Sequence, residues 1–503
     1  MRVTPRIIRW AGLAGSVATA ASAYLGGSGV VREPSVNPVT LLSGARGFLL
    51  PVCWLVGTVL LIGAWWSGLR VVPSLRWVLV TVGLWYLPVL PFLPLGSADV
   101  YSYACQGYVQ YAGGDPYAGG VAEFGCPWLS SVASSWAHSP APYGPLFLLL
   151  AAASVGIAGT SVEGVIAGLR VIALAGLVLV AIGLPVLARR AGTDPARAVW
   201  LVLACPLVLV HLVSGAHNDA LMVGLIVVGL VATSRPDTVR AAANPGGSRR
   251  PLVWLVAGGL LLGFAVSVKA TAIVVVPFAV LAAVPPGSPP SALRRPALAI
   301  GGALIAAVGL LSAISGRGFG SVAGLLRSGD TVAWTSPSTA VGMSVEYAGR
   351  LFGARIDAVG ATRVAGVAVL AVLLAVLWRR ARRRGALGGA GLALAATVCC
   401  APVFHPWYAT WPLAVLAAAW AERPTGARAP AGVAGTAQPP DGGVRTGIRW
   451  LLGLCAFAAT LTTPAGYNWA LYTRIPGALM MTAALVVLGA VVVRRVRPSG
   501  ALA

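Results

Sequence analysis

The chain has 503 residues, of which 58% are hydrophobic and only 10% are charged, and its mean hydropathy is +0.84. This balance excludes a soluble globular protein. The formal net charge is +23, but the basic residues form short clusters between apolar runs. That distribution follows the positive-inside rule of membrane proteins and argues against nucleic-acid binding.

Apolar runs of about 20 residues recur along the chain, which predicts an all-α polytopic protein with one integral membrane domain over residues 1–503. The first run follows an arginine-rich start, and we interpret it as a spanning helix and not as a signal peptide. The predicted spans are 8–26, 47–66, 77–95, 165–188, 198–213, 219–233, 252–267, 270–284, 297–314, 359–378, 387–403, 407–420, 449–465 and 475–493. These 14 crossings place both termini in the cytoplasm.

The first large extracytoplasmic loop, residues 96–142, contains three acids, no basic residue and many aromatic side chains. Aromatic rings can stack on sugars, and carboxylates can bind hydroxyls or act as bases. The alternative is an ordinary loop with an interfacial aromatic belt. The apolar segment 145–158 that follows is short. We interpret it as re-entrant or interfacial, because a crossing here would place the later arginine clusters outside.

Two acids in this loop differ in setting. Asp99 lies where a helix leaves the membrane, so its carboxylate is either a partly desolvated base or a helix-end cap. Asp115 lies in Asp-Pro-Tyr between two glycine pairs, where a plain turn is the favoured interpretation. Cys105 and Cys126 are the two cysteines predicted to lie outside, and we expect them to form a disulfide contributing about 3 kcal/mol.

Three further features fall on the same predicted side. His217-Asn218-Asp219 begins an apolar helix, either as a helix cap or as a buried functional group. Lys269 is the one lysine among 36 basic residues, an arginine bias typical of a GC-rich genome such as an actinobacterial one. It either snorkels to the interface or holds a phosphate as a point charge, which we favour.

The last of these features is His405-Pro406-Trp407-Tyr408, which lies between two apolar segments. His405 could donate to a phosphate, whereas the alternative is an aromatic belt broken at Pro406. The second outer loop, 316–358, adds five candidates for acceptor binding, none of which stands out: Arg317, Arg327, Trp334, Glu346 and Arg350. Segments 234–251 and 424–447 are rich in proline, glycine, alanine and arginine and are predicted to be disordered cytoplasmic linkers. The sequence contains neither a zinc-type Cys/His spacing nor a phosphate-binding glycine loop.

The order of these motifs resembles a known family. D-V-Y-S-Y from Asp99, D-P-Y, Y-G-P, H-N-D-A, a lone V-K and H-P-W-Y together resemble the GT-C superfamily of membrane glycosyltransferases. More narrowly, they are similar to the actinobacterial polyprenyl-phosphomannose-dependent α-1,6-mannosyltransferases of the MptB type, over roughly residues 70–470. The family commonly has Asn where this chain has Asp115, which leaves the role of that position open.

The resemblance implies an inverting mannosyltransferase at the outer face of the plasma membrane. Its donor would be polyprenyl-phosphate-mannose, and its acceptor a 6-hydroxyl of a lipid-linked α-1,6-mannan, as in a lipomannan backbone. Asp99 would be the general base, Lys269 and His405 would stabilise the leaving phosphate, and Asp219 would orient hydroxyls. Further acceptor or sugar contacts are expected from His217, Asn218, Tyr101, Tyr103, Asp115, Tyr117, Tyr143, Trp334, Trp407 and Tyr408. No cofactor is expected, although nearby acids leave a divalent metal open.

Two alternatives stay open at this point. One is a transferase of the same fold that uses another polyprenyl-phosphate sugar or another acceptor, such as a phosphatidylinositol mannoside. The other is a transporter or lipid flippase. A transporter predicts ionisable residues in mid-membrane and inverted repeats, whereas the charged residues here cluster at one face and no repeat is evident.

Overall fold

The computed structural model describes residues 3–26, 48–91, 93–243, 250–327, 332–420, 442–466 and 468–496. Across these ranges the chain is helical, with a single isolated β-bridge, so the predicted all-α class is confirmed. The α-helices are α1 (Pro5–Gly26), α3 (Leu49–Gly68), α4 (Leu75–Tyr86), α5 (Asp99–Tyr111), α6 (Ser134–Ala137), α7 (Pro145–Ala158), α8 (Val162–Arg190), α9 (Pro195–Leu203), α10 (Asp219–Thr233), α11 (Pro236–Ala243), α12 (Arg250–Val268), α13 (Val276–Ala282), α14 (Pro290–Ile314), α15 (Gly320–Arg327), α16 (Pro337–Leu351), α17 (Val359–Arg384), α18 (Ala386–Cys400), α19 (Thr410–Trp420), α20 (Gly442–Ala459) and α21 (Arg474–Val496).

Short helical turns connect several of these helices: η1 (Leu87–Val89), η2 (Val121–Phe124), η3 (Leu129–Ser131), the π-helix η4 (Val208–Ser214), η5 (Ala270–Val275), η6 (Pro406–Ala409) and η7 (Trp469–Leu471). Local sequence explains many of the boundaries. The Asp194 side chain caps α9 by accepting from two backbone N–H groups, and Pro195 occupies the first helical position. Helix α17 ends with three arginines, which suit the negative end of the helix dipole.

The described residues contain five helices long and apolar enough to cross a membrane: α3, α8, α14, α17 and α21. The pair α9 and η4 makes a sixth candidate, bent by 68°. Seven shorter apolar helices accompany them, including α7, whose 14 residues rise about 21 Å, less than the roughly 30 Å of a bilayer core. The chain is thus a multi-pass membrane protein, whereas the 14 crossings and the re-entrant α7 remain predictions.

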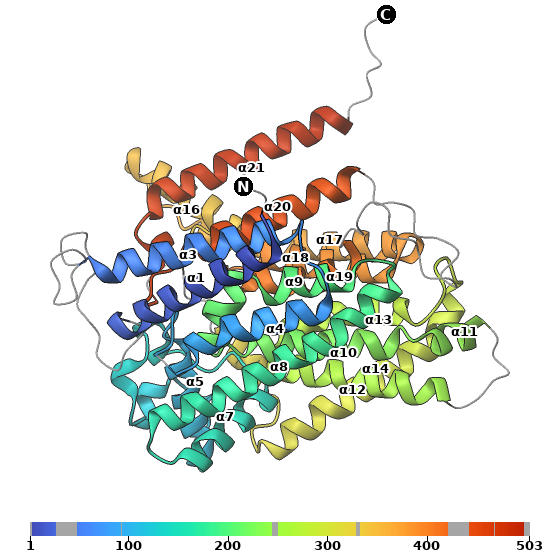
Figure 1. The fold of residues 1–503 in the computed structure, drawn as a ribbon, viewed down its shortest axis with the longest axis horizontal. Helices are drawn as coiled ribbons and strands as arrows, with labels where there is room; N and C mark the ends of the chain where they lie inside the picture. The colour runs from blue at the N-terminus through green and yellow to red at the C-terminus, as the bar shows by residue number, and fades with distance from the viewer. Residues whose placement is uncertain are drawn as a thin grey trace, which may run out of the picture.

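The helices of the bundle begin and end at two opposite ends, which Figure 1 shows, and these ends differ in their side chains. At one, which we call the arginine end, α8, α10, α13 and α17 finish while α14 and α18 begin. Arg190 on α8 donates to Ser234 after α10, and Arg382 on α17 donates to the Ser288 carbonyl before α14. At the other, the site end, α5 and α10 begin and α12 finishes. Several loops predicted for the same side of the membrane therefore lie at the same end of the bundle, while the side that each end faces stays a prediction.

Glycines let the helices of the site end approach closely. A Cβ at Gly176 of α8 would lie 2.3 Å from the Ala220 backbone of α10, and a Cβ at Gly259 of α12 would lie 2.5 Å from the Ile300 carbonyl of α14. Such close backbone contact is the usual way that membrane helices pack. This packing positions the start of α10, where Asp219 lies, and the end of α12, which Lys269 follows.

Parts of the two segments predicted to be disordered linkers, 234–251 and 424–447, are helical in the structure. Residues 236–243 of the segment 234–251 form α11, because Pro236 suits the first helical position, Asp237 lies in the first turn and an alanine run follows. The segment 424–447 overlaps the beginning of α20 from residue 442. The remaining parts, 244–249 and 424–441, lie outside the described residues.

Candidate active site

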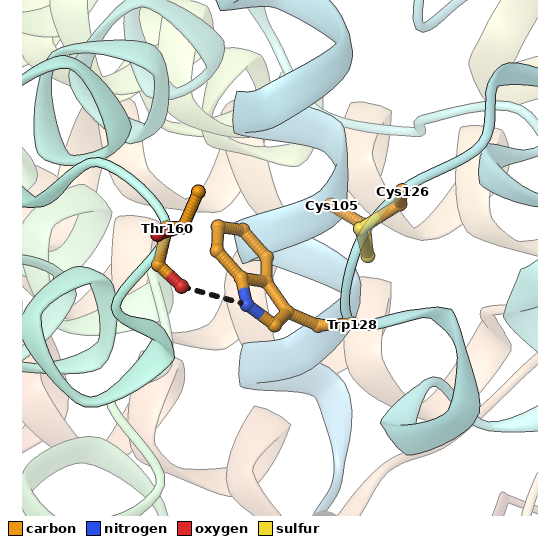
Figure 2. Close-up of a disulfide and its surroundings, with 4 residues drawn as sticks. All are labelled: Cys105, Cys126, Trp128 and Thr160. Atoms are coloured by element: carbon orange, nitrogen blue, oxygen red, sulfur yellow. Dashed lines mark hydrogen bonds between the residues drawn. A yellow bond between two sulfur atoms is a disulfide. The ribbon is translucent and has the colours of Figure 1, made fainter.

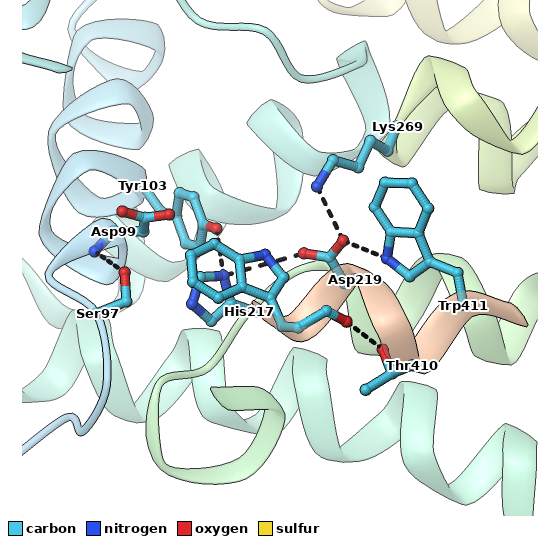
Figure 3. A network of polar contacts seen from close by, with 9 residues as sticks. Ser97, Asp99, Tyr103, His217, Asp219, Lys269, Thr410 and Trp411 are labelled. Atoms are coloured by element: carbon cyan, nitrogen blue, oxygen red, sulfur yellow. Dashed lines mark hydrogen bonds and ion pairs between the residues drawn. The ribbon is translucent and has the colours of Figure 1, made fainter. Parts of the chain in front are cut away.

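Four separate stretches of chain bring polar side chains together at the site end (Figure 3). Asp99 is the first residue of α5, Asp219 is the first residue of α10, and Lys269 follows α12. The turn η6 and helix α19 add His405, Trp407, Tyr408 and Trp411. Each acid lies at a helix N-terminus, where the helix dipole favours negative charge.

The Asp99 carboxyl is buried, with 7% of the residue exposed. Its backbone N–H donates to the Ser97 hydroxyl over 3.0 Å, which fixes the start of α5. Burial is the main cause that raises the pKa of Asp99 to about 6, while hydrogen bonds to Ser97 and Trp136 and the charge of Lys269 act against it, and the charge of Asp219 adds to it. A carboxylate with a pKa near 6 is ionised at neutral pH and basic enough to assist loss of a hydroxyl proton.

Asp219 and Lys269 form a buried ion pair. The Lys269 Nζ lies 2.8 Å from Asp219 Oδ1, and their side chains are 12% and 0% exposed. Trp411 Nε1 donates to the same Oδ1 over 2.7 Å. The other oxygen, Oδ2, is buried and accepts no hydrogen bond from the described residues, although it lies 3.9 Å from His217 Nδ1 (Figure 3). Asp219 thus holds the ammonium with one oxygen and leaves the second free for a further donor.

Aromatic rings surround the Lys269 ammonium. Its Nζ lies 4.4 Å from the Tyr408 ring centroid, 5.0 Å from that of Trp411 and 5.9 Å from that of Tyr143. Burial lowers the pKa of Lys269, but Asp219 and the neighbouring groups together raise it by more, so Lys269 is charged at neutral pH. The ring faces and one carboxylate hold the ammonium in place but do not occupy all three of its N–H donors.

The histidines of the site are neutral at neutral pH. His217 Nδ1 is hydrogen-bonded to the Tyr103 hydroxyl over 2.9 Å, and burial lowers its pKa well below the ordinary range. Burial, with the charge of Lys269, lowers the pKa of His405 to about 3. Both rings stack on Trp407, with centroids 3.9 Å and 4.6 Å away. His405 can therefore donate one hydrogen bond to a ligand but adds no positive charge.

The backbone before His217 is strained. Ala216 has φ 51°, the one positive φ among the described non-glycine residues, and the π-helix η4 ends two residues earlier. Strained backbone and π-helical turns occur mostly at functional sites. Asn218 is 1% exposed, and neither atom of its amide has a described partner, so this turn keeps polar groups unpaired inside the protein.

Several residues predicted for the site lie elsewhere. Asp115 Oδ1 accepts from the Tyr117 N–H over 2.9 Å, so this acid forms the predicted turn. Tyr117 donates its hydroxyl to the Tyr143 carbonyl and packs against two glycines of α15. Burial raises the pKa of Tyr101 to about 12, and the charge of Arg170 on α8 acts against this rise. Trp334 donates to Thr473 over 3.1 Å and packs on α21. The hydrogen bonds named for Asp115, Tyr117 and Trp334 are not made with Asp99, Asp219 or Lys269, and the binding roles of these residues stay predictions.

Three residues of the site were not predicted. Trp411 follows Trp407 by four positions, and this helical spacing was a usable signal. His211 packs against Trp407 at 5.0 Å between ring centroids, so three of the chain's four histidines meet there. Trp136 reaches Asp99 from the short helix α6, and only the folded loop brings it there.

The predicted disulfide between Cys105 and Cys126 is present, with the Cα atoms 5.5 Å apart (Figure 2). It ties the loop after α5 back to α5, about two turns from Asp99. Next to it, Trp128 donates to the Thr160 carbonyl in the turn between α7 and α8. The loop is thus attached near its middle both to α5, which carries Asp99, and to the turn between α7 and α8. Across the described residues, no group of three or more His, Cys, Asp or Glu side chains is arranged to hold a metal ion.

Comparison with known proteins gives matches over most of the chain. Residues 9–285 match the family model described as alpha-(1->6)-mannopyranosyltransferase, N-terminal domain, and residues 338–494 match the MptB C-terminal domain. An alpha-(1->6)-mannopyranosyltransferase of Mycobacterium tuberculosis is 34% identical in an alignment of 387 positions, and the match covers 68% of this chain and 65% of the relative. The alpha-(1->6)-mannopyranosyltransferase B of Corynebacterium glutamicum is 32% identical over 80% of this chain and 68% of its own length.

The chain therefore spans slightly less than two thirds, 65%, of the length of the first relatives. Among solved structures, an oligosaccharyltransferase of Archaeoglobus fulgidus aligns with a TM-score of 0.34 and 16% identity, over 81% of this chain and 51% of that one. That likeness is too distant to carry an argument.

Proposed function

Because this chain belongs to the alpha-(1->6)-mannopyranosyltransferase family, we propose that it is a membrane mannosyltransferase that forms α-1,6 linkages. The donor is polyprenyl-phosphate-mannose, and the acceptor is the 6-hydroxyl of a lipid-linked mannan at the outer face of the plasma membrane. The observation that carries the proposal is the pairing of a buried, ionisable base with a buried cation in one site. Asp99 and Lys269 are close enough for each to shift the pKa of the other.

The proposed reaction is a single displacement. The acceptor 6-hydroxyl oxygen attacks C1 of the donor mannose while its proton passes to Asp99. The bond between C1 and the phosphate oxygen breaks, and its electron pair leaves with the polyprenyl phosphate. A β-linked donor gives an α-linked product, because attack comes from the opposite face. Asp99 supplies general-base catalysis, which typically contributes about 10²- to 10⁴-fold.

The charge change at phosphate gives Lys269 its role. The phosphodiester of the donor carries one negative charge, and the released monoester gains a second as C1–O cleavage proceeds. Lys269 is a fixed cation that meets this developing charge in a partly dry site, where such interactions are strong. His405 is neutral and acts as a hydrogen-bond donor to the same group. One ammonium suits a single phosphate better than a diphosphate, which favours a polyprenyl-phosphate sugar over a nucleotide sugar.

The contacts of Asp219 suggest a second role beside the orientation of hydroxyls that the family resemblance implies. Its Oδ1 is occupied by Lys269 and Trp411, so the residue mainly positions the ammonium. Only Oδ2 is left to accept from a sugar hydroxyl. We therefore assign Asp219 as a positioning residue for Lys269 and, through Oδ2, as a contact to substrate. Tyr103, Tyr143, Trp407 and Tyr408 provide the ring faces for the sugar and its acceptor.

The outer location is supported by two features at opposite ends. The disulfide Cys105–Cys126 lies in the loop of the site end, and disulfides persist in oxidising compartments. The opposite end carries arginines, which the positive-inside rule assigns to the cytoplasm. A transporter is not favoured, because the two buried acids among the described residues, Asp99 and Asp219, both lie at the site end.

The test is transfer of labelled mannose in proteoliposomes that contain the purified full-length chain. Polyprenyl-phosphomannose is supplied with an α-1,6-mannoside, and parallel reactions use polyprenyl-phosphoglucose, GDP-mannose or a phosphatidylinositol mannoside. We expect transfer from polyprenyl-phosphomannose to the mannoside and none from GDP-mannose. Preference for another sugar or acceptor would overturn the assigned substrates. Translocation of the lipid without transfer would overturn the enzyme assignment.

A further inference from the structure

A cavity of about 260 Å³ lies at the arginine end, away from the candidate active site. Helices α8, α10, α11, α13, α14, α17 and α18 all contribute to its wall. Most of the lining side chains are apolar, including Leu187, Leu230, Leu281 and Leu387. None of the described residues that line it is acidic. The reaction proposed above uses no residue of this cavity.

Two arginines give this apolar cavity a charged rim. Arg190 and Arg382 line it and are half-buried, whereas their chain neighbours Arg189 and Arg383 are exposed. Arg190 Nη1 donates to Ser234 Oγ over 3.0 Å, and Arg382 Nη2 donates to the Ser288 carbonyl over 3.3 Å. Both serines also line the cavity, so each guanidinium is fixed at its edge.

These fixed guanidiniums retain binding capacity. A guanidinium has five N–H donors, and the described bonds use only Nη1 of Arg190 and Nη2 of Arg382. Arginine is the residue that best matches the planar oxygens of a phosphate. Two positive charges at the edge of an apolar chamber, with no acid among the described residues that line it, fit a molecule with an anionic head and a hydrocarbon tail.

We propose that this cavity binds an anionic phospholipid, with the headgroup phosphate between Arg190 and Arg382 and part of an acyl chain in the apolar chamber. Basic pockets between membrane helices on the cytoplasmic side are known to select anionic lipid headgroups. Exposed arginines of α14 and α17 at this end, among them Arg294, Arg295 and Arg384, attract the same leaflet. The bound lipid fills the gap between the ends of α8, α10, α13 and α17, and it needs no turnover at the active site.

The experiment is native mass spectrometry of the full-length protein released from phosphatidylcholine nanodiscs that contain phosphatidylglycerol. We expect the wild-type protein to retain phosphatidylglycerol in preference to phosphatidylcholine. Arg190→Gln with Arg382→Gln should reduce that retention by about 25-fold, at about fivefold per charge near the membrane surface. The matched control, Arg189→Gln with Arg383→Gln, removes the same charge from exposed neighbours and should retain the lipid.

A second variant tests the contribution of the apolar chamber separately from that of the two arginines. Ala386→Phe fills the cavity from α18 and keeps both arginines, so it should also lose the lipid. Equal retention by the Arg190/Arg382 variant and its control would overturn the proposal, as would retention of phosphatidylcholine to the same extent. Unchanged retention by Ala386→Phe would overturn the acyl-chain part. Because the readout is lipid mass, failure of the transferase assignment would leave these results unaffected.

Discussion

The two ends of the bundle carry charge in opposite ways. At the site end, Lys269 is paired with Asp219 over 2.8 Å and both are buried. At the arginine end, Arg189 and Arg383 are exposed, and Arg190 and Arg382 are anchored by serines and carbonyls instead of acids. Burying a charge is costly unless it is paired, so the protein keeps its buried pair where chemistry requires it. Exposed arginines can be exchanged at little cost, whereas the buried pair cannot.

The largest effect is expected from removing the base at the site end, and a second acid in the same loop provides the control. Asp99→Asn keeps the size of the side chain and removes the base, and we expect mannose transfer to fall by about 10³-fold. Asp115→Asn is the matched control, because asparagine can accept the same Tyr117 N–H bond that forms the turn. It should retain nearly full activity. Equal losses of transfer in the two variants, measured at equal expression, would contradict the assignment of Asp99 as the base.

Removal of the cation should have the next largest effect. Lys269→Met leaves Asp219 buried without its partner, and we expect loss of transfer by about 10²-fold or more. Breaking a buried pair from one side also costs about 3–5 kcal/mol in the free energy of unfolding. Arg383→Gln at the arginine end should change that free energy by less than about 0.5 kcal/mol. Thermal unfolding in detergent measures the loss of stability in each variant. Similar losses for Lys269→Met and Arg383→Gln would contradict the difference between the two ends.

Asp219→Asn should have a smaller effect on transfer than loss of Lys269. The amide still accepts from Trp411 but no longer holds the ammonium by charge. We expect about a tenfold increase in KM for the donor, with a smaller decrease in kcat, since a hydrogen bond to a charged group is worth about 1.5–3 kcal/mol. Steady-state kinetics with varied donor make the distinction. A change in kcat alone would place Asp219 in the chemical step.

The disulfide should matter more to stability than to rate. Replacing Cys105 and Cys126 with serine opens a loop of 21 residues, and we expect a loss of about 3 kcal/mol. The helix start that carries Asp99 stays fixed by Ser97, so transfer by the folded fraction should decrease less than threefold. Loss of all transfer at a temperature where the variant is folded would show that the loop positions the site directly.

Much of this architecture could be predicted from the sequence. Helical class, the loop with Asp99, the lone lysine and the disulfide all follow from patterning and composition. The Lys269–Asp219 contact could not be predicted, because residues 50 positions apart meet only through glycine-mediated packing of α8, α10, α12 and α14. Tyr117 and Trp334 were expected near the sugar, yet tertiary packing places them against α15 and α21. An aromatic residue in a loop carries no local signal that separates these outcomes.

The dependence of kcat/KM on pH tests the assignment of the base most directly. Because Asp99 must be ionised, transfer should decrease as pH falls through about 6, the value to which burial raises its pKa. Asp219 contributes to that rise, so Asp219→Asn should move the acid limb to lower pH, while Arg383→Gln should leave it in place. An acid limb near pH 4, as for an ordinary aspartate, or one that does not respond to Asp219→Asn, would contradict the account.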